Sequence, residues 1–219
     1  MPPAPTFLAR GPWSREDVSF SWTDAPYEPT ADVVAAADEA IAALKARSSP
    51  SHDGLSTRLA GHRVDEHGRL HLDLQPIRWA LRLLPGGAAR SMTGQCVVRS
   101  HDGRWLAGRR ADWVATWAGR WTLGAGGAVD VGESPMHTLE RELREEWSVT
   151  AERLRGEALL LLPNEVVMFV GVAWLPPGAE VERDPEHDEH EWWPADIDTW
   201  PDHVELPLRA LARMIEAAG

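Results

Sequence analysis

Glu142, Glu145 and Glu146 are the residues of this sequence whose types and spacing most directly suggest chemistry. In a helix, positions i, i+3 and i+4 lie along one stripe, so the three carboxylates would stand close together. Like charges at this spacing repel each other unless a cation lies among them. Hard carboxylate oxygens suit Mg²⁺ or Mn²⁺. The stripe therefore predicts a divalent metal site, with a solvated helix face as the alternative.

The helix that must carry these glutamates is well marked in the sequence. Ser134 can cap the free N–H groups of a helix start, and Pro135 suits the first helical position. Apolar residues then recur at steps of three and four, which places them on one face: Met136, Leu139, Leu143 and Trp147. We therefore expect a helix that packs this face on a core and presents its carboxylates on the neighbouring stripe.

The segment GAVDVGESPMHTLERELREEWSV, residues 127–149, resembles the Nudix box. That box is the signature of hydrolases acting on nucleoside diphosphates linked to another moiety. It reads G, five residues, E, seven residues, then R-E-U-x-E-E-x-G-U, with U a bulky aliphatic residue. The chain matches every fixed position except the last glycine, which is Ser148. The resemblance implies an α/β fold, the family's α/β/α sandwich with a mixed central sheet.

The resemblance also assigns roles to the box residues. It implies metal ligands at Glu142, Glu145 and Glu146, joined by the backbone carbonyl of Gly126, with Mg²⁺ as the cofactor and Mn²⁺ as an alternative. The glycines around residue 126 would let the backbone approach a metal or phosphate closely.

Two further positions of the box concern its geometry. Glu133 and Arg141 correspond to the family's structural ion pair, and a planar guanidinium suits the task of fixing the loop before the helix. Ser148 resists the left-handed conformation that glycine would tolerate at a helix exit. We expect a modest adjustment there and no loss of metal binding.

Hydrolysis also needs a carboxylate that takes a proton from the attacking water. In the family this base comes from the box helix or from a loop far downstream. Glu142 and Glu145 therefore compete with Glu186 and Glu189 of the segment EHDEHEWWP. We favour the downstream side slightly, with Glu189 as the predicted base. Glu165, next to a turn, is a third possibility.

Candidates for substrate binding lie just ahead of the box. Arg109, Arg110 and Arg120 could meet phosphate oxygens, or could serve surface solubility. Trp113 and Trp117 could stack on a base, although packing is the commoner role of tryptophan.

Three further residues, two histidines and the single cysteine, are of types that carry other chemistry. His187 and His190 beside Asp188 suggest a zinc site, but the surrounding glutamates favour a solvated acidic loop. Cys96 lies in an apolar strand and is interpreted as a core residue.

Composition limits the classes of partner and compartment. The net charge of −12 disfavours binding to nucleic acid or to an anionic membrane surface. A single cysteine allows no intrachain disulfide and suits a reducing cytoplasm. We find no signal peptide and no apolar run of membrane-spanning length. A cytoplasmic protein is therefore expected.

The order of predicted elements suggests two parts. Residues 1–90 form an N-terminal α+β extension, with a proline-rich arm, a helix after Thr30 that Ser48-Ser49-Pro50 ends, and a hairpin around Gly68. Residues 91–219 form the Nudix domain, with short strands, the acidic helix and a closing amphipathic helix from Leu206. Within it, the run VVMFVGVAWL is a candidate central strand because it is apolar on both faces, and residues 178–190 are expected to be a charged loop.

The function implied is metal-dependent hydrolysis of a pyrophosphate linkage in a nucleotide. The resemblance implies that an N-terminal extension forms dimer contacts or completes the pocket of a larger substrate, which favours a nucleoside diphosphate joined to a sugar, or ADP-ribose, over the alternatives. These are a nucleoside triphosphate pyrophosphatase of the house-cleaning type and a non-catalytic Nudix-fold module that senses a nucleotide. The many tryptophans and the arm are compatible with a homodimer.

Overall fold

The computed structural model describes residues 5–47, 53–86 and 88–217. Within these ranges the chain forms two β-sheets with three α-helices and three short 3-10 helices. The strands are β1 (Thr6–Trp13), β2 (Val18–Trp22), β3 (Leu55–Val64), β4 (Leu70–Arg78), β5 (Met92–Arg99), β6 (Trp105–Arg110), β7 (Trp121–Leu123), β8 (Ala125–Ala128), β9 (Arg153–Leu161), β10 (Val167–Trp174) and β11 (His187–Trp193). The helices are α1 (Ala31–Ala46), α2 (Pro135–Trp147), α3 (Leu206–Glu216), η1 (Arg15–Asp17), η2 (Trp79–Leu83) and η3 (Ile197–Thr199).

The main sheet is mixed and has eight strands. Its order is β1-β9-β10-β5-β6-β11, with β7 paired to β6 and β8 paired to β5. Strand β10 runs parallel to β5 and antiparallel to β9, so it lies inside the sheet with neighbours on both sides. This confirms the prediction of a central strand, which followed from a sequence that is apolar on both faces.

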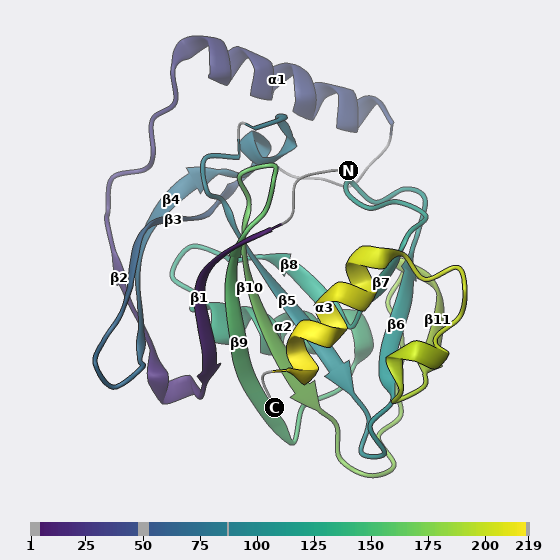
Figure 1. The fold of residues 1–219 in the computed structure, drawn as a ribbon. Helices are drawn as coiled ribbons and strands as arrows, with labels where there is room; N and C mark the ends of the chain where they lie inside the picture. The colour runs from purple at the N-terminus through teal and green to yellow at the C-terminus, as the bar shows by residue number, and fades with distance from the viewer. Residues whose placement is uncertain (1–4, 48–52, 87, 218–219) are drawn as a thin grey trace.

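Helices cover both faces of the main sheet. Helix α2 packs its buried side on the face that carries Phe169 and Ala173, whereas α3 packs on the opposite face over Val170 and Val172. Figure 1 shows this layering, with the yellow helix α3 in front of the sheet and α2 behind it. The expected α/β/α sandwich with a mixed central sheet is confirmed.

The N-terminal region forms a second layer of structure beside the main sheet. Strands β2, β4 and β3 make a three-stranded sheet, and α1 packs on η2 above it (Figure 1). Strand β1 instead pairs with β9 at the edge of the main sheet. One core cluster therefore contains residues from both sides of residue 90, and the proposed division at that residue stays a prediction.

Several segments differ from the expectation. The segment 178–190, expected to be a loop, contains the start of edge strand β11, and the proline-rich arm contributes β1 and β2. The glycine-rich stretch before the box is not only a loop, because β8 pairs with β5. The expected end of the first helix at residues 48–50 lies outside the described residues.

None of the helices in the described part of the chain is long and apolar enough to span a membrane.

Candidate metal and catalytic site

Helix α2 is built as its sequence predicts. Ser134 caps it, since its hydroxyl accepts a hydrogen bond from the backbone N–H of His137 at 3.2 Å, and Pro135 opens the first turn. The apolar stripe is fully buried: Met136, Leu139, Leu143 and Trp147. Burial of this stripe fixes the rotation of the helix about its axis, and that rotation decides which way the neighbouring glutamates point.

Two of the three glutamates are buried against the glycine-rich strand β8. Glu142 is 8% exposed and Glu146 is 4% exposed. Glu146 Oε1 accepts a hydrogen bond from the Gly126 backbone N–H at 3.2 Å. The Glu142 carboxylate lies directly over Gly127, where a Cβ atom would overlap it. The third, Glu145, has a side chain that is 58% exposed, so it faces solvent beside the buried pair.

Arg141 holds the box loop onto the helix. Its Nε donates to Glu133 Oε1 at 3.1 Å, and its Nη2 donates to the Ala128 carbonyl at 3.0 Å. Through Nη1 it also donates to Glu142 at 2.7 Å and to Glu145 at 3.0 Å. The guanidinium therefore ties the loop to two of the predicted metal ligands as well as to its expected partner.

The electrostatics of the buried pair fit a cation. Burial, and then the charge of Glu142, raises the pKa of the Glu146 carboxyl well above its usual value. Burial also raises the pKa of Glu142, although Arg141 opposes the shift. Two buried carboxyls whose ionised forms are disfavoured would gain from a divalent cation, and their oxygens are the ligands such a cation prefers. The oxygen ligands of the two glutamates, and the glycine backbone of β8 against which they lie, therefore fit a divalent metal ion.

The carboxylates do not form a ready-made cluster. Among residues 5–47, 53–86 and 88–217, no group of three or more His, Cys, Asp or Glu side chains gathers in ligand geometry. Glu142 and Glu145 instead share the Arg141 guanidinium. Metal binding at these residues would therefore require Glu145 to turn, which its exposed position permits.

The segment after residue 181 closes over the C-terminal end of α2. The backbone N–H of Asp184 donates to the Glu146 carbonyl at 2.9 Å, and that of Glu182 donates to the Trp147 carbonyl at 3.0 Å. Arg110 lies between the two parts, with Nη1 at 3.0 Å from Glu186 Oε2 and at 3.8 Å from Glu146 Oε1. Glu186 is thereby linked to the buried carboxylate pair through one guanidinium.

The other candidates for the general base lie farther out. Glu189 is on β11 opposite Arg109, and its carboxylate is 3.8 Å from that guanidinium. Glu165 is in the β9–β10 turn with a φ of 66°. Neither forms an ion pair or side-chain hydrogen bond that joins it to the box carboxylates of the described chain. Of the downstream carboxylates, Glu186 has the shorter connection to Glu146.

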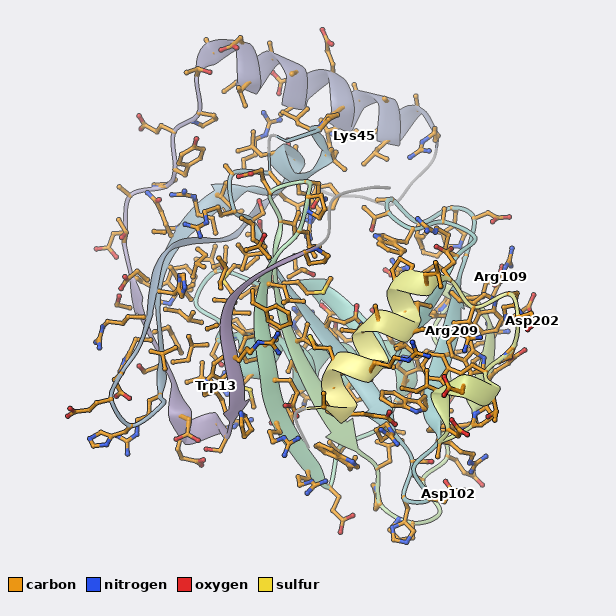
Figure 2. The ribbon with its side chains drawn as sticks, in the orientation of Figure 1. Trp13, Lys45, Asp102, Arg109, Asp202 and Arg209 are labelled. Atoms are coloured by element: carbon orange, nitrogen blue, oxygen red, sulfur yellow. The ribbon has the colours of Figure 1, made fainter. Side chains whose placement is uncertain are left out.

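The predicted substrate-binding arginines are all paired with carboxylates. Arg109 pairs with Asp188, and Arg120 pairs with Glu205, while Arg110 pairs with Glu186 as described above. Figure 2 shows Arg109 on the β6–β11 side of the molecule. To bind a phosphate, each of these guanidinium groups would have to exchange its carboxylate partner.

The two predicted tryptophans lie exposed in the loop between β6 and β7. Trp113 is 40% exposed and Trp117 is 46% exposed. Trp117 has a φ of 60°, which is unusual for a bulky side chain, and the Arg120 guanidinium lies 4.4 Å from its ring centroid. The loop starts beside the site, because the Ala111 backbone N–H donates to the Glu186 carbonyl at 2.7 Å.

Two residues near the site were missed or dismissed from sequence. His187 is completely buried beside Glu146, whereas its acidic neighbourhood suggested a solvated loop. For Arg82, on η2 of the N-terminal region, burial lowers the pKa of the guanidinium to about 10, and the negative charge of Glu142 opposes this shift. Neither residue lies in a motif, and only the tertiary fold brings His187 beside Glu146 and Arg82 within the electrostatic influence of Glu142.

Cys96 is fully buried, as expected of a core residue, and burial raises the pKa of its thiol. A thiol in this state is a poor nucleophile.

A comparison with known protein families gives a match to the segment that contains this site. A family model described as the NUDIX domain matches residues 92–206, which is more than half of the chain. No curated protein matches the sequence.

Several solved structures have a similar course of the chain. The MutT protein from Methanosarcina mazei is 25% identical, with 58% of this chain and 94% of that chain covered and a TM-score of 0.45. DR0079 from Deinococcus radiodurans is 20% identical, with 76% and 91% covered and a TM-score of 0.48. The MutT NUDIX hydrolase from Burkholderia pseudomallei is 23% identical, with 57% and 97% covered and a TM-score of 0.48.

Proposed function

The chain belongs to the NUDIX domain family, and on that premise we propose that it is a divalent-metal-dependent hydrolase of a pyrophosphate linkage in a nucleotide. The favoured substrate class is a nucleoside diphosphate joined to another moiety, of the NDP-sugar or ADP-ribose type. Mg²⁺ is the proposed cofactor, and Mn²⁺ is the alternative.

The observation that carries the proposal is the burial of two carboxylates against a glycine backbone. Glu142 and Glu146 lie over Gly127 and Gly126, and burial raises the pKa of both carboxyls. A protein does not ordinarily bury two neighbouring acidic groups without a cation or a proton to neutralise them. The glycines leave room for the carboxylates, and the carboxylates would hold the metal together with Glu145 and the Gly126 carbonyl.

A bound divalent cation would neutralise phosphate charge and lower the pKa of a coordinated water. The residues of the chain supply the rest. Glu186 or Glu189 would accept the proton of the attacking water, and Glu186 is favoured by its connection through Arg110 to Glu146. Glu142 and Glu145 stay as alternatives for this base. Arg141 would keep the loop and the ligand-bearing helix in register.

Recognition of the nucleotide is proposed for the loop between β6 and β7. Trp113 and Trp117 expose aromatic faces on which a base could stack. Arg82 is a better candidate for a phosphate oxygen than Arg109 or Arg120, because it forms no ion pair with another described residue. Its position on η2 would give the N-terminal region a part in the pocket.

The lone buried cysteine fits a cytoplasmic location. The homodimer expected from the sequence stays a prediction, to be measured by light scattering of the purified chain.

A substrate panel tests the proposal. Product release should be measured with Mg²⁺ for ADP-ribose, UDP-glucose, NADH and the deoxynucleoside triphosphates. We expect turnover of at least one diphosphate-linked compound. Glu145→Gln and Glu146→Gln should lower kcat/KM by about a hundredfold or more, because each removes a ligand worth several kcal/mol of transition-state stabilisation.

The control for these substitutions is Glu140→Gln. Glu140 is on the same helix but pairs with Arg15, away from the buried pair, so its variant should keep full activity. Activity unchanged by Glu145→Gln and Glu146→Gln would sink the metal-ligand assignment. Turnover restricted to triphosphates would favour the house-cleaning pyrophosphatase, and tight binding of a nucleotide without any turnover would favour the sensing module.

A further inference from the structure

His187 is a buried imidazole that contacts a proposed metal ligand. It lies at the start of β11 with no exposed surface. Its ring packs on the Trp147 indole, with centroids 4.7 Å apart and planes inclined by 34°. Gly108 of β6 lies against both rings, and a Cβ atom there would overlap the imidazole, 2.9 Å from Nε2, and the Trp147 indole at 2.8 Å. The absence of a side chain at residue 108 therefore leaves room for the His187 ring.

The two ring nitrogens face two carboxylates. Nε2 is 3.8 Å from Glu146 Oε2, and Nδ1 is 3.5 Å from Asp184 Oδ1. Neither nitrogen makes a hydrogen bond to a described residue. A buried polar atom without a hydrogen-bond partner destabilises the folded protein by about 1–3 kcal/mol. The imidazole of His187 has two such atoms. Both carboxylates lie just beyond hydrogen-bonding distance.

The backbone holds this arrangement at both ends. The Asp184 N–H donates to the Glu146 carbonyl at 2.9 Å, and the His187 N–H donates to the Asp184 carbonyl at 3.3 Å. The Arg183 guanidinium donates to the His187 carbonyl at 2.5 Å. These bonds fix the backbone of His187 relative to the C-terminal end of α2, and the packing on Trp147 fixes the ring. On the opposite side of the Glu146 carboxylate, Oε1 accepts the Gly126 N–H.

We propose that His187 is a positioning residue that orients Glu146 for the divalent cation, with Asp184 orienting the imidazole in turn. This rests on the proposed function, since it concerns the same metal. The Gly126 N–H holds one oxygen of Glu146, and the His187 ring lies 3.8 Å from the other, so the imidazole limits where that oxygen can move. Partners of metal ligands that act in this way typically change metal affinity by about 10–100-fold when they are removed.

Two substitutions that differ by one methylene group separate positioning from packing. In His187→Gln the side-chain amide reaches the place of Nε2 and can still meet Glu146, whereas in His187→Asn it reaches only the place of Nδ1, towards Asp184. Both variants lose the ring that packs on Trp147, so their loss of stability should be similar. The probe is Mn²⁺ alone, titrated calorimetrically into the full-length chain, with thermal unfolding measured alongside.

We expect His187→Asn to weaken Mn²⁺ binding by about tenfold or more, and His187→Gln to restore most of the affinity. His190→Asn is the matched control, because His190 is exposed on the same strand and touches Trp147 only at its edge; it should bind Mn²⁺ as the wild type does. Asp184→Asn, which leaves the core packing intact, should weaken binding to a smaller extent.

Equal affinities of the Asn and Gln variants would overturn the proposal, whether both match the wild type or both are weakened alike. In the second case His187 would have a packing role only. A wild-type chain that binds no Mn²⁺ and hydrolyses no nucleotide would overturn the proposed function itself. The two failures are distinguished by the wild-type titration.

Discussion

At the scale of single residues, the site depends on glycines whose missing side chains leave space for functional groups. Gly127 and Gly108 leave the volumes that the Glu142 carboxylate and the His187 ring fill. Glu142 has little freedom to give way, because it is buried and accepts a hydrogen bond from Arg141 at 2.7 Å. A single methyl group at residue 127 would therefore act on the proposed metal site directly.

Gly127→Ala should displace the Glu142 carboxylate and raise the Mg²⁺ concentration needed for half-maximal activity by about tenfold or more. The measurement is the Mg²⁺ dependence of turnover with the best substrate of the panel. Gly61→Ala is a matched control, since its Cβ would also meet a carboxylate oxygen, that of Asp73 at 2.7 Å, but on β3 in the small sheet. Equal Mg²⁺ dependence in the two variants would contradict the role of Glu142.

At the scale of elements, local signals were sufficient for the helix and insufficient for the edge strands. Helix α2 has its cap, its proline and its apolar stripe within 14 residues, Ser134 to Trp147, and all were found in the structure. Strand β11 reads HDEHEWW, and its charged residues suit an edge strand as well as a loop. What makes it a strand is pairing with β6, where Glu189 lies opposite Arg109. Such long-range pairing has no local signature.

The same difference between local and long-range signals explains which parts of the site could be predicted from the sequence. The box residues follow each other in sequence, so their shared face was predictable from helical periodicity. His187 and Glu186 reach the box only through the folding of β11 and of the loop before it. Sequence spacing between these residues and Glu146 carries no information about their contact.

The exit of helix α2 gives a test at the element scale. Ser148 adopts the left-handed conformation, with φ 55° and ψ 27°, and its N–H donates to the Arg144 carbonyl at 3.0 Å. The serine thus accepts the strain that glycine would avoid, about 1–2 kcal/mol. Glycine also loses more conformational entropy than other residues when the chain folds, which costs about 0.5–1 kcal/mol. Ser148→Gly should therefore stabilise the protein by about 0.5–1 kcal/mol.

Urea unfolding measures this difference, with Ser148→Ala as the control. Alanine resists the left-handed region as serine does, and Ser148 is exposed, so the alanine variant should show no gain. A glycine variant no more stable than the alanine variant would mean that the serine is not strained at this position.

At the scale of the whole molecule, the two sheets share a core. Trp13 of β1 is buried, stacks on Phe169 of β10 with ring centroids 6.1 Å apart, and donates from Nε1 to the Gly68 carbonyl of the β3–β4 turn at 2.9 Å. It therefore joins the N-terminal sheet, the edge strand and the central strand of the main sheet. Figure 2 shows it on the β1 side of the molecule, across the sheet from Arg109. Residues on both sides of residue 90 depend on it.

Trp13→Ala should lower the free energy of unfolding by about 3–5 kcal/mol, the usual cost of emptying so large a site in a core. Because the core is shared, the loss should reach the main sheet. Hydrogen exchange measures this directly: the amides of β10 should lose protection together with those of β3 and β4. Trp113→Ala, at an exposed tryptophan, should leave protection unchanged in both sheets. Loss confined to β3 and β4 would show that residues 1–90 unfold as a separate unit, and would favour the division at residue 90 that the sequence suggested.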